Sequence, residues 1–421
     1  MKWSWTGKEL EDIRKRFVYV EEDPDYGKRL FFDNSGGSLR LREAEEARSR
    51  WDLLPDCPER YHERAQVMNA MMDACHDDLL HSVFGAKEGS LMTELTASQT
   101  FFQIMHVALE NLPGKNVVTS NVEHPSAYDA AKLYCEKLGL ELRVARANPK
   151  TGFVEPEEVA RLVDEDTILV GVIAASNISG NIMDLRGIGE AIRKKNPEVY
   201  FFSDAVQHMP HGVVDVEGCG IDFMNFAPYK FFASRGIGIG YISPRLASLC
   251  HHKLEAKAVN EWELGSPAPG VFASVQAVID YVVELGGEAP TRRESYLRGM
   301  EAIAAQERAL LELLLEGTEE VKGLRHRPYV HVYVDGEDLT LRDLIVAMGI
   351  EGRRPEELTK AYARHGVTVY ERVNSSLYSK RILEAMNLEG AVRVSPLHCH
   401  TPEEILRFLD ITEEIWKEGE V

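Results

Sequence analysis

Residues 168–175 read ILVGVIAA, the longest unbroken apolar run in the chain. A run of this length, followed by the polar pair Ser176-Asn177, is typical of a strand that is buried on both faces of a parallel sheet. Shorter β-rich runs occur at 116–120, 142–145, 199–203, 223–226 and 238–242, and helical patterns occur at 126–138, 155–162 and 187–195. This alternation predicts an α/β fold with a mainly parallel sheet.

The pattern changes from residue 291 onward. A long helical stretch at 293–316 precedes short β-rich runs at 331–334, 367–371 and 391–394, and 401–417 is helical with Thr401 as its N-cap. We expect a large domain at 41–290 and a small α+β domain at 291–421. An N-terminal segment at 1–40 is expected to pack near the small domain and the active site.

The composition excludes several functional classes. The 421 residues include 48 Lys+Arg and 68 Asp+Glu, which gives a net charge of −20. Nucleic acids and anionic membranes select basic surfaces, so we expect neither as a partner. The N-terminal segment lacks the apolar stretch of a signal peptide, and no apolar run approaches the roughly 20 residues of a membrane span. The six cysteines form no CxxC pair. We expect a soluble, cytoplasmic protein.

Polar residues follow several of the predicted strands, at the edge where open α/β sheets bind ligands. They are Glu123-His124, Ser176-Asn177, Asp204, Gln207 and Lys230. Each has an ordinary structural explanation as well: His124 as a core histidine, Asn177 as a turn residue and Asp204 as a helix cap. Four strand ends that supply His, Asn, Asp and Lys nevertheless favour a functional site.

Lys230 is the most unusual of these residues, because Phe226, Tyr229, Phe231 and Phe232 surround it in sequence. A lysine among aromatic residues either extends its amine to the surface or is held where burial lowers its pKa, as a Schiff-base lysine requires. The glycines at 236, 238 and 240 alternate with isoleucines, which suits a strand better than a dinucleotide-binding loop. An NAD-dependent oxidoreductase is therefore disfavoured.

The order of several motifs resembles the class V aminotransferase family, in the cysteine desulfurase-like branch of fold-type I pyridoxal 5'-phosphate (PLP) enzymes. The likeness runs from FFDNSGGS (31–38) to AVRVSPLHCHTPEEI (391–405), through EHPS (123–126), SNISG (176–180), SDAVQ (203–207) and the lysine with its glycines (230–240). It implies a large PLP-binding domain with a mainly parallel sheet and a small α+β domain.

The resemblance also implies roles for the strand-end residues. Lys230 would be the lysine that carries PLP and transfers protons, and Asp204 would keep the pyridine nitrogen protonated. Gln207 would bind the phenolic oxygen of the ring, and His124 would stack on its face as part of the catalytic site. Asn177 would contact both cofactor and substrate.

The remaining implied contacts involve phosphate, substrate and partner subunit. The segment LTASQTFFQ (95–103) corresponds to the phosphate loop, with Ala97, Ser98 and Gln99 at a helix N-terminus. Ser203 and Tyr229 would add cofactor contacts. Arg393 would bind the substrate carboxylate as a fork, beside Gly36 and Gly37. The segment EWELGSPAPG (261–270) resembles the one that reaches the partner's phosphate through Ser266, which implies a homodimer with shared active sites.

One family feature is missing. Cysteine desulfurases carry a nucleophilic cysteine shortly before the carboxylate-binding arginine, but no cysteine lies between Cys250 and Cys399, and 370–388 read YERVNSSLYSKRILEAMNL. Cys399 follows Arg393 and is interpreted as structural. His398 and His400 have no further ligands nearby in sequence, so we expect no metal site.

These observations favour a PLP enzyme that deprotonates Cα of an L-amino acid and then eliminates a substituent, as a C–S lyase does, without a catalytic cysteine. An aminotransferase or epimerase is the alternative within the family, and a non-catalytic scaffold with this fold is a more remote one. Residues in 35–40, 264–271 and 370–381 are expected to line the substrate pocket. Tyr370, Arg372 and Tyr378 indicate a polar or acidic substrate.

Overall fold

The run ILVGVIAA belongs to a seven-stranded sheet in the computed structural model, which describes residues 2–266 and 268–418. The strand order is β4-β10-β9-β8-β7-β5-β6. The bounds are β4 (Ser90–Glu94), β5 (Asn116–Ser120), β6 (Glu141–Ala145), β7 (Thr167–Gly171), β8 (Tyr200–Asp204), β9 (Phe223–Phe226) and β10 (Gly238–Ile242). Neighbours from β9 to β6 are parallel, and β10 is antiparallel to β4 and β9. The predicted α/β fold is confirmed.

The inner strands of this sheet, such as β7 and β9, are buried on both faces, which explains why they are mostly apolar. Successive side chains point to opposite faces, so Phe202 packs in one core with Phe223 while Phe201 packs in another with Met224. The strand β7 ends at Gly171, earlier than predicted. The N–H groups of Val172 and Ala174 still donate to carbonyls of β8, so the run extends toward the site.

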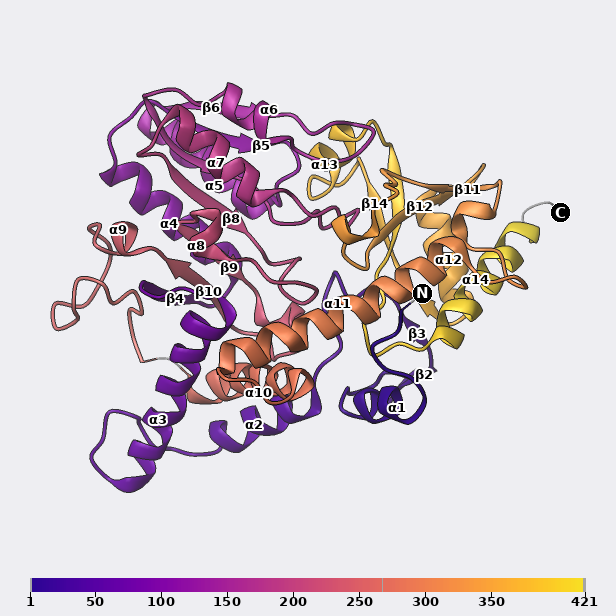
Figure 1. The fold of residues 1–421 in the computed structure, drawn as a ribbon, viewed down its shortest axis with the longest axis horizontal. Coiled ribbons are helices and arrows are strands. Elements are labelled where there is room, and N and C mark those ends of the chain that lie inside the picture. The colour runs from indigo at the N-terminus through magenta and orange to yellow at the C-terminus, as the bar shows by residue number, and fades with distance from the viewer. Residues whose placement is uncertain (1, 267, 419–421) are drawn as a thin grey trace.

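Helices cover both faces of the large sheet (Figure 1). The helices α4 (Ala97–Asn111) and α5 (Pro125–Leu138) pack on one face. The others that precede residue 290 are α1 (Gly7–Lys15), α2 (Arg42–Asp52), α3 (Glu63–Asp77), α6 (Pro156–Arg161), α7 (Leu185–Lys195), α8 (Val216–Cys219), α9 (Pro244–Ala247) and α10 (Pro269–Gly286). Within the described residues, no helix is both long enough and apolar enough to cross a membrane.

A second, antiparallel sheet has the order β11-β12-β15-β14. It consists of β11 (Val330–Val332), β12 (Val346–Ile350), β14 (Tyr370–Val373) and β15 (Gly390–Val394). The helices of this region are α11 (Arg292–Glu316), α12 (Pro355–Arg364), α13 (Lys380–Ala385) and α14 (Pro402–Lys417). The sequence reading missed the central strand β12 and joined β14 with the short strand β13 (Val367–Thr368).

The N-terminal segment lies against the second sheet. Its strand β3 (Leu30–Phe31) pairs in parallel with β13, and Asp33 forms a bridge with Ser395. The long helix α11 extends from beside α10 toward α14 (Figure 1), with Tyr296 and Ile303 in the large core and Leu310 and Leu314 in the core of the second sheet. Because α11 contributes to both cores, the domain division at residue 290 stays a prediction.

Candidate active site

A cavity of about 230 Å³ lies at the carboxyl ends of β8 and β9, and the N-terminus of α4 forms part of its wall. It gathers side chains from separate segments of the large sheet. The lining residues are Thr96, Ala97, Ser98, His124, Ser126, Ile173, Asn177, Asp204, Val206, Gln207, Ala227, Tyr229, Lys230 and Arg235. Among them are eight residues that the sequence predicts for the site: Ala97, Ser98, His124, Asn177, Asp204, Gln207, Tyr229 and Lys230.

Lys230 is buried at the end of a 3₁₀ turn (Pro228–Lys230) that follows β9. Its Nζ lies 3.4 Å from Oε1 of Gln207. Burial lowers the pKa of Lys230 from 10.5 to about 7, and the positive charge of Arg393 acts in the same direction. A large fraction of the amine is therefore unprotonated at neutral pH, which is the form that attacks a carbonyl or accepts a proton.

The chain turns sharply after Lys230. Phe232 has φ of 61°, a left-handed conformation that costs a non-glycine residue about 1 kcal/mol or more. Its ring is fully buried and contacts the rings of Phe17, Phe231 and His398, so packing holds the strained backbone in place. This packing holds the turn that follows Lys230 in position.

Asp204 ends β8, and its carboxyl group is buried. Its Oδ1 accepts a hydrogen bond from the N–H of Val206 at 3.0 Å. Burial raises the pKa of Asp204 to about 6, while that hydrogen bond and the charge of Lys230 lower it. A buried carboxylate of this kind is stabilised by a cationic partner in the cavity.

The N-terminus of α4 forms another wall. Asn225 Nδ2 donates to the carbonyl of Ala97 at 2.8 Å, which fixes the first turn. A Cβ at Gly238 would lie 2.1 Å from Ala97 N, so only glycine in β10 lets the helix start this close to the sheet. Free N–H groups and the helix dipole make such an end suitable for an anion. Gln99 is exposed, and its backbone N–H donates to the N-cap hydroxyl of Thr96.

His124 is the N-cap of α5, where Nδ1 accepts from the N–H of Ser126. Burial lowers the pKa of His124 to about 3, and the charge of Lys230 adds to that effect. The ring is therefore neutral at physiological pH, so it offers a flat apolar face and a proton acceptor. Arg381 of α13 donates to the carbonyls of Asn121 and Glu123 and so holds this turn.

Arg393 reaches the same region from β15. Its Nη1 donates to the carbonyl of Asn177 at 3.0 Å, and its Nη2 donates to Oδ1 of Asp33 at 2.7 Å. A Cβ at Gly36 would lie 2.8 Å from Asp33 Oδ2 and 3.2 Å from Arg393 Nη2, so the glycine lets residues 33–37 close over the arginine. Asp33 belongs to the quoted motif FFDNSGGS, but the sequence analysis assigned it no role.

Comparisons with known proteins show which family this chain belongs to. The family model Aminotransferase class-V matches residues 56–408. The cysteine desulfurase IscS of Dictyoglomus turgidum is 26% identical over 311 residues, 72% of each chain. The IscS of Methanosarcina thermophila is 25% identical over 403 residues, 92% of each chain. The apo structure of a cysteine desulfurase from Thermococcus onnurineus has a TM-score of 0.82 at 21% identity, and the match covers 99% of this chain and 100% of that one.

The chain belongs to the class V aminotransferase family. The predicted resemblance is thereby confirmed, and with it the fold-type I architecture. The protein is a PLP-dependent enzyme, as the members of this family are.

The cavity of this class V enzyme fits PLP, which presents an aldehyde, a ring nitrogen, a phenolic oxygen and a phosphate. Lys230 supplies a largely neutral amine for the aldehyde, and Asp204 supplies a buried carboxylate for the ring nitrogen. The N-terminus of α4 supplies N–H groups for the phosphate. Within the described residues, Oδ1 of Asn177 is buried without a hydrogen-bond partner, which leaves it available to a ligand.

The structure does not bring every predicted residue to this cavity. The hydroxyl of Ser203 donates to the carbonyl of Val172 inside the sheet, because alternate side chains of β8 point to opposite faces and the cavity receives Asp204 instead. Ser266 lies on an exposed loop, where it donates to Glu59. Its predicted contact with the partner subunit stays a prediction, and Pro267 of the same segment lies outside the described residues.

The residues after Arg393 are engaged in packing. Nε2 of His398 lies 2.8 Å from the hydroxyl of Tyr281, and Nδ1 of His400 accepts from the N–H of Leu397. Burial raises the pKa of the Cys399 thiol well above its usual range, which leaves it unreactive. Across residues 2–266 and 268–418, no group of three or more His, Cys, Asp or Glu side chains is arranged to hold a metal ion.

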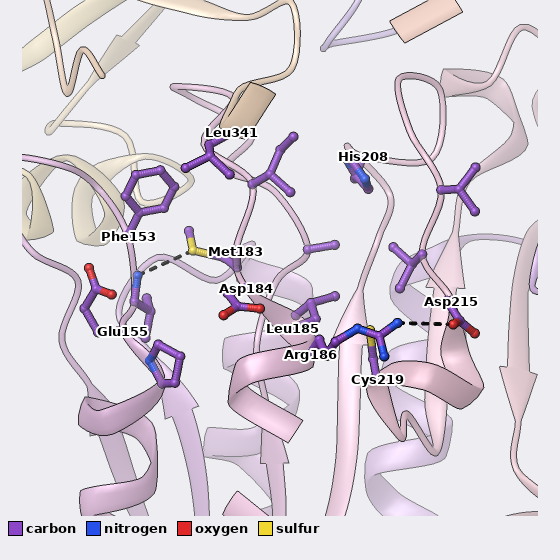
Figure 2. A pocket seen from close by; sticks show the side chains of 16 residues that line it. Phe153, Glu155, Met183, Asp184, Leu185, Arg186, His208, Asp215, Cys219 and Leu341 are labelled. Carbon is purple, nitrogen blue, oxygen red and sulfur yellow. Dashed lines mark hydrogen bonds and ion pairs between the residues drawn. The ribbon is translucent and has the colours of Figure 1, made fainter. Parts of the chain in front are cut away.

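A larger cavity, of about 590 Å³, lies elsewhere, with Phe153, Met183, His208 and Leu341 in its wall (Figure 2). Most of its lining is apolar, and none of the predicted site residues lines it. Nδ1 of His208 lies 3.1 Å from Asp343. The chemically active side chains therefore gather in the smaller cavity.

Proposed function

We propose that this enzyme acts on an L-amino acid by removing the Cα proton and then eliminating a substituent, in a cysteine desulfurase-like C–S lyase reaction that uses no catalytic cysteine. The observation that carries the proposal is the buried amine of Lys230, with its pKa near 7, in a cavity flanked by Asp204 and the carboxylate-binding candidate Arg393.

The proposed mechanism assigns a task to each side chain. Arg393 binds the α-carboxylate of the substrate as a fork, in exchange for its contact with Asp33. PLP, when bound, supplies the electron sink that stabilises the charge developing at Cα. The neutral Nζ of Lys230 takes the Cα proton, and Asp204 keeps a positive charge on the ring nitrogen. His124, which lines the cavity, would cover the bound cofactor and exclude water, and Gln207 orients the lysine through its Oε1.

The loop before Arg393 supports elimination over persulfide transfer. Residues 374–379 read NSSLYS, with exposed Leu377 and Tyr378 where desulfurases carry their nucleophile. Cys399 is buried and has a raised thiol pKa. Elimination requires only a base and an electron sink, so this set of residues is sufficient. The shared Cα deprotonation makes transamination the alternative to be tested.

We also propose a homodimer in which Ser266 of each subunit completes the phosphate site of the other. The loop that carries Ser266 is exposed, and it lies beside the N-terminal end of α10. A dimer that persists at nanomolar concentration and a weakened PLP affinity in a Ser266→Ala variant would support this arrangement.

The proposed function is tested by colour and by product analysis. We expect the purified enzyme to absorb visible light, borohydride to bleach the band, and a Lys230→Ala variant to lack it. Amino acids, including cysteine and its S-conjugates, are then assayed for ammonia, keto acid and sulfide. Ammonia and keto acid released without an amino acceptor indicate elimination, whereas keto acid that requires an acceptor indicates transamination. An unchanged spectrum in Lys230→Ala would contradict the proposal.

A further inference from the structure

The face of the second sheet that carries Arg393 also carries a second buried arginine, Arg372. In the register of β14 and β15, Tyr370 is opposite Arg393 and Arg372 is opposite Ala391. Residues directly opposite each other, and residues two apart in one strand, share a face of the sheet. Arg372 and Arg393 therefore point to the same side, and both are buried, with 8% and 3% of their surfaces exposed.

Among the described residues, only one of these two guanidinium groups forms an ion pair with a carboxylate. Arg393 pairs with Asp33. Within residues 2–266 and 268–418, Arg372 has no ion pair; its Nη2 donates to the carbonyl of Tyr378 at 3.1 Å, and its buried Nε has no partner. Both guanidinium carbons lie over the ring of Tyr370, at 5.7 and 5.6 Å from its centre. Of the two arginines, Arg372 therefore carries a positive charge that no ion pair among the described residues balances.

The charge of Arg372 acts on the cavity. It lowers the pKa of Lys230 and that of His124, as an adjacent cation does. A buried cation without a counterion destabilises a protein unless a ligand supplies the missing charge. The α-carboxylate of a substrate would occupy Arg393, and none of the described carboxylates forms an ion pair with Arg372, so this guanidinium group is available to a second anionic group.

We propose that Arg372 binds an anionic group on the substrate side chain, so that the enzyme selects amino acids with acidic side chains. The relevant groups are carboxylate, sulfinate, sulfonate and phosphate, which share the planar or forked oxygen pairs that arginine binds. This inference rests on the proposed function, because it assigns Arg393 to the α-carboxylate. It makes Arg372 the residue that determines specificity.

The test compares matched ligands that differ only in charge. S-carboxymethyl-L-cysteine is set against its amide, S-carbamoylmethyl-L-cysteine, and L-aspartate against L-asparagine. Binding to the PLP-loaded enzyme is measured by calorimetry and by the change in visible absorbance, and kcat/KM is measured where turnover occurs. The wild-type enzyme is expected to favour each acid over its amide by about 10- to 100-fold. Cysteine sulfinate and O-phosphoserine show which anion is preferred.

Three variants separate recognition from folding. Arg372→Gln is expected to lose the preference for the acids while it binds the amides within about twofold of wild type. Arg372→Lys keeps the charge and is expected to retain part of the preference. Arg364→Gln, at an exposed arginine of α12 that pairs with Glu418, is the control and should behave as wild type.

Thermal unfolding without ligand gives an independent readout. Because Arg372 has no counterion, Arg372→Gln is expected to keep or raise the Tm. A lowered Tm, equal binding of acids and amides by the wild-type enzyme, or an equal loss of both in Arg372→Gln would overturn the inference. A visible band with no discrimination of charge contradicts this inference alone, whereas the absence of the band also contradicts the proposed function.

Discussion

Two cavities of this enzyme, of about 590 and 230 Å³, differ in what their polar side chains contact. In the larger one, Arg186 pairs with Asp215 (Figure 2), and the remaining lining is mostly apolar. The ring of His208, in the same wall, pairs with Asp343. In the smaller one, burial lowers the pKa of Lys230 and raises that of Asp204. Volume measures only empty space, whereas buried titratable groups with shifted pKa values indicate where a ligand binds.

The largest expected effect comes from removing one side chain from each cavity, which tests whether the reaction takes place in the smaller one. We expect Lys230→Ala to lower kcat by about 10²- to 10⁴-fold, because the chain loses its proton acceptor. Leu341→Ala, in the wall of the larger cavity, should leave kcat within about twofold of wild type. Steady-state kinetics with the best substrate measure both, and comparable losses would refute the assignment.

The pH dependence of cofactor uptake tests the shifted pKa of Lys230. Only the neutral amine attacks the PLP aldehyde, so the uptake rate of cofactor-free protein should rise about tenfold per pH unit below 7 and level off above it. Stopped-flow absorbance follows the reaction. Since the charge of Arg393 lowers this pKa, Arg393→Gln should move the midpoint to higher pH. A wild-type midpoint near the ordinary value of 10.5 would contradict the burial of this amine.

Replacing Asp204 should have a smaller effect, which appears in the free energy of unfolding. Its pKa rises from 3.8 in the unfolded chain to about 6 in the folded cofactor-free protein, so the ionised carboxylate destabilises the fold increasingly from pH 3.8 to 6 and constantly above that. Asp204→Asn should raise the free energy of unfolding at pH 7.5 by up to about 3 kcal/mol, and by less at pH 4.5. Urea unfolding at both values measures the difference. A variant that is less stable at pH 7.5 would show that the carboxylate is already neutralised.

The larger cavity should affect stability without affecting chemistry. Asp343→Asn removes the charge that faces the buried ring of His208, and we expect it to lower the free energy of unfolding by about 1–2 kcal/mol. Its kcat should stay within about twofold of wild type. Urea unfolding and kinetics on the same preparation check both values. Normal stability with strongly reduced kcat would place this cavity in the reaction.

The sequence by itself determined the elements whose patterns are local. The runs at 116–120, 223–226 and 238–242 form strands with the predicted bounds, since a strand buried on both faces is rich in apolar and β-branched residues. The strand-end residues Lys230, Asp204, Gln207 and His124, which were predicted from the sequence, line one cavity, because the carboxyl ends of parallel strands meet at one edge of the sheet.

Only the tertiary structure decided the features that join distant segments. The strand β12 was missed because 344–350 read LIVAMGI, an apolar run that suits helix and strand alike until β11 and β15 pair with it. The sequence does not show which residues of β8 line the cavity. In the structure the hydroxyl of Ser203 instead donates to a carbonyl within the sheet. Asp33 and Arg393 meet across 360 residues, and Arg372 lies on the same face of the second sheet as Arg393, without an ion pair among the described residues. The spacing of residues along the sequence does not predict such contacts, because they depend on how the two sheets pack.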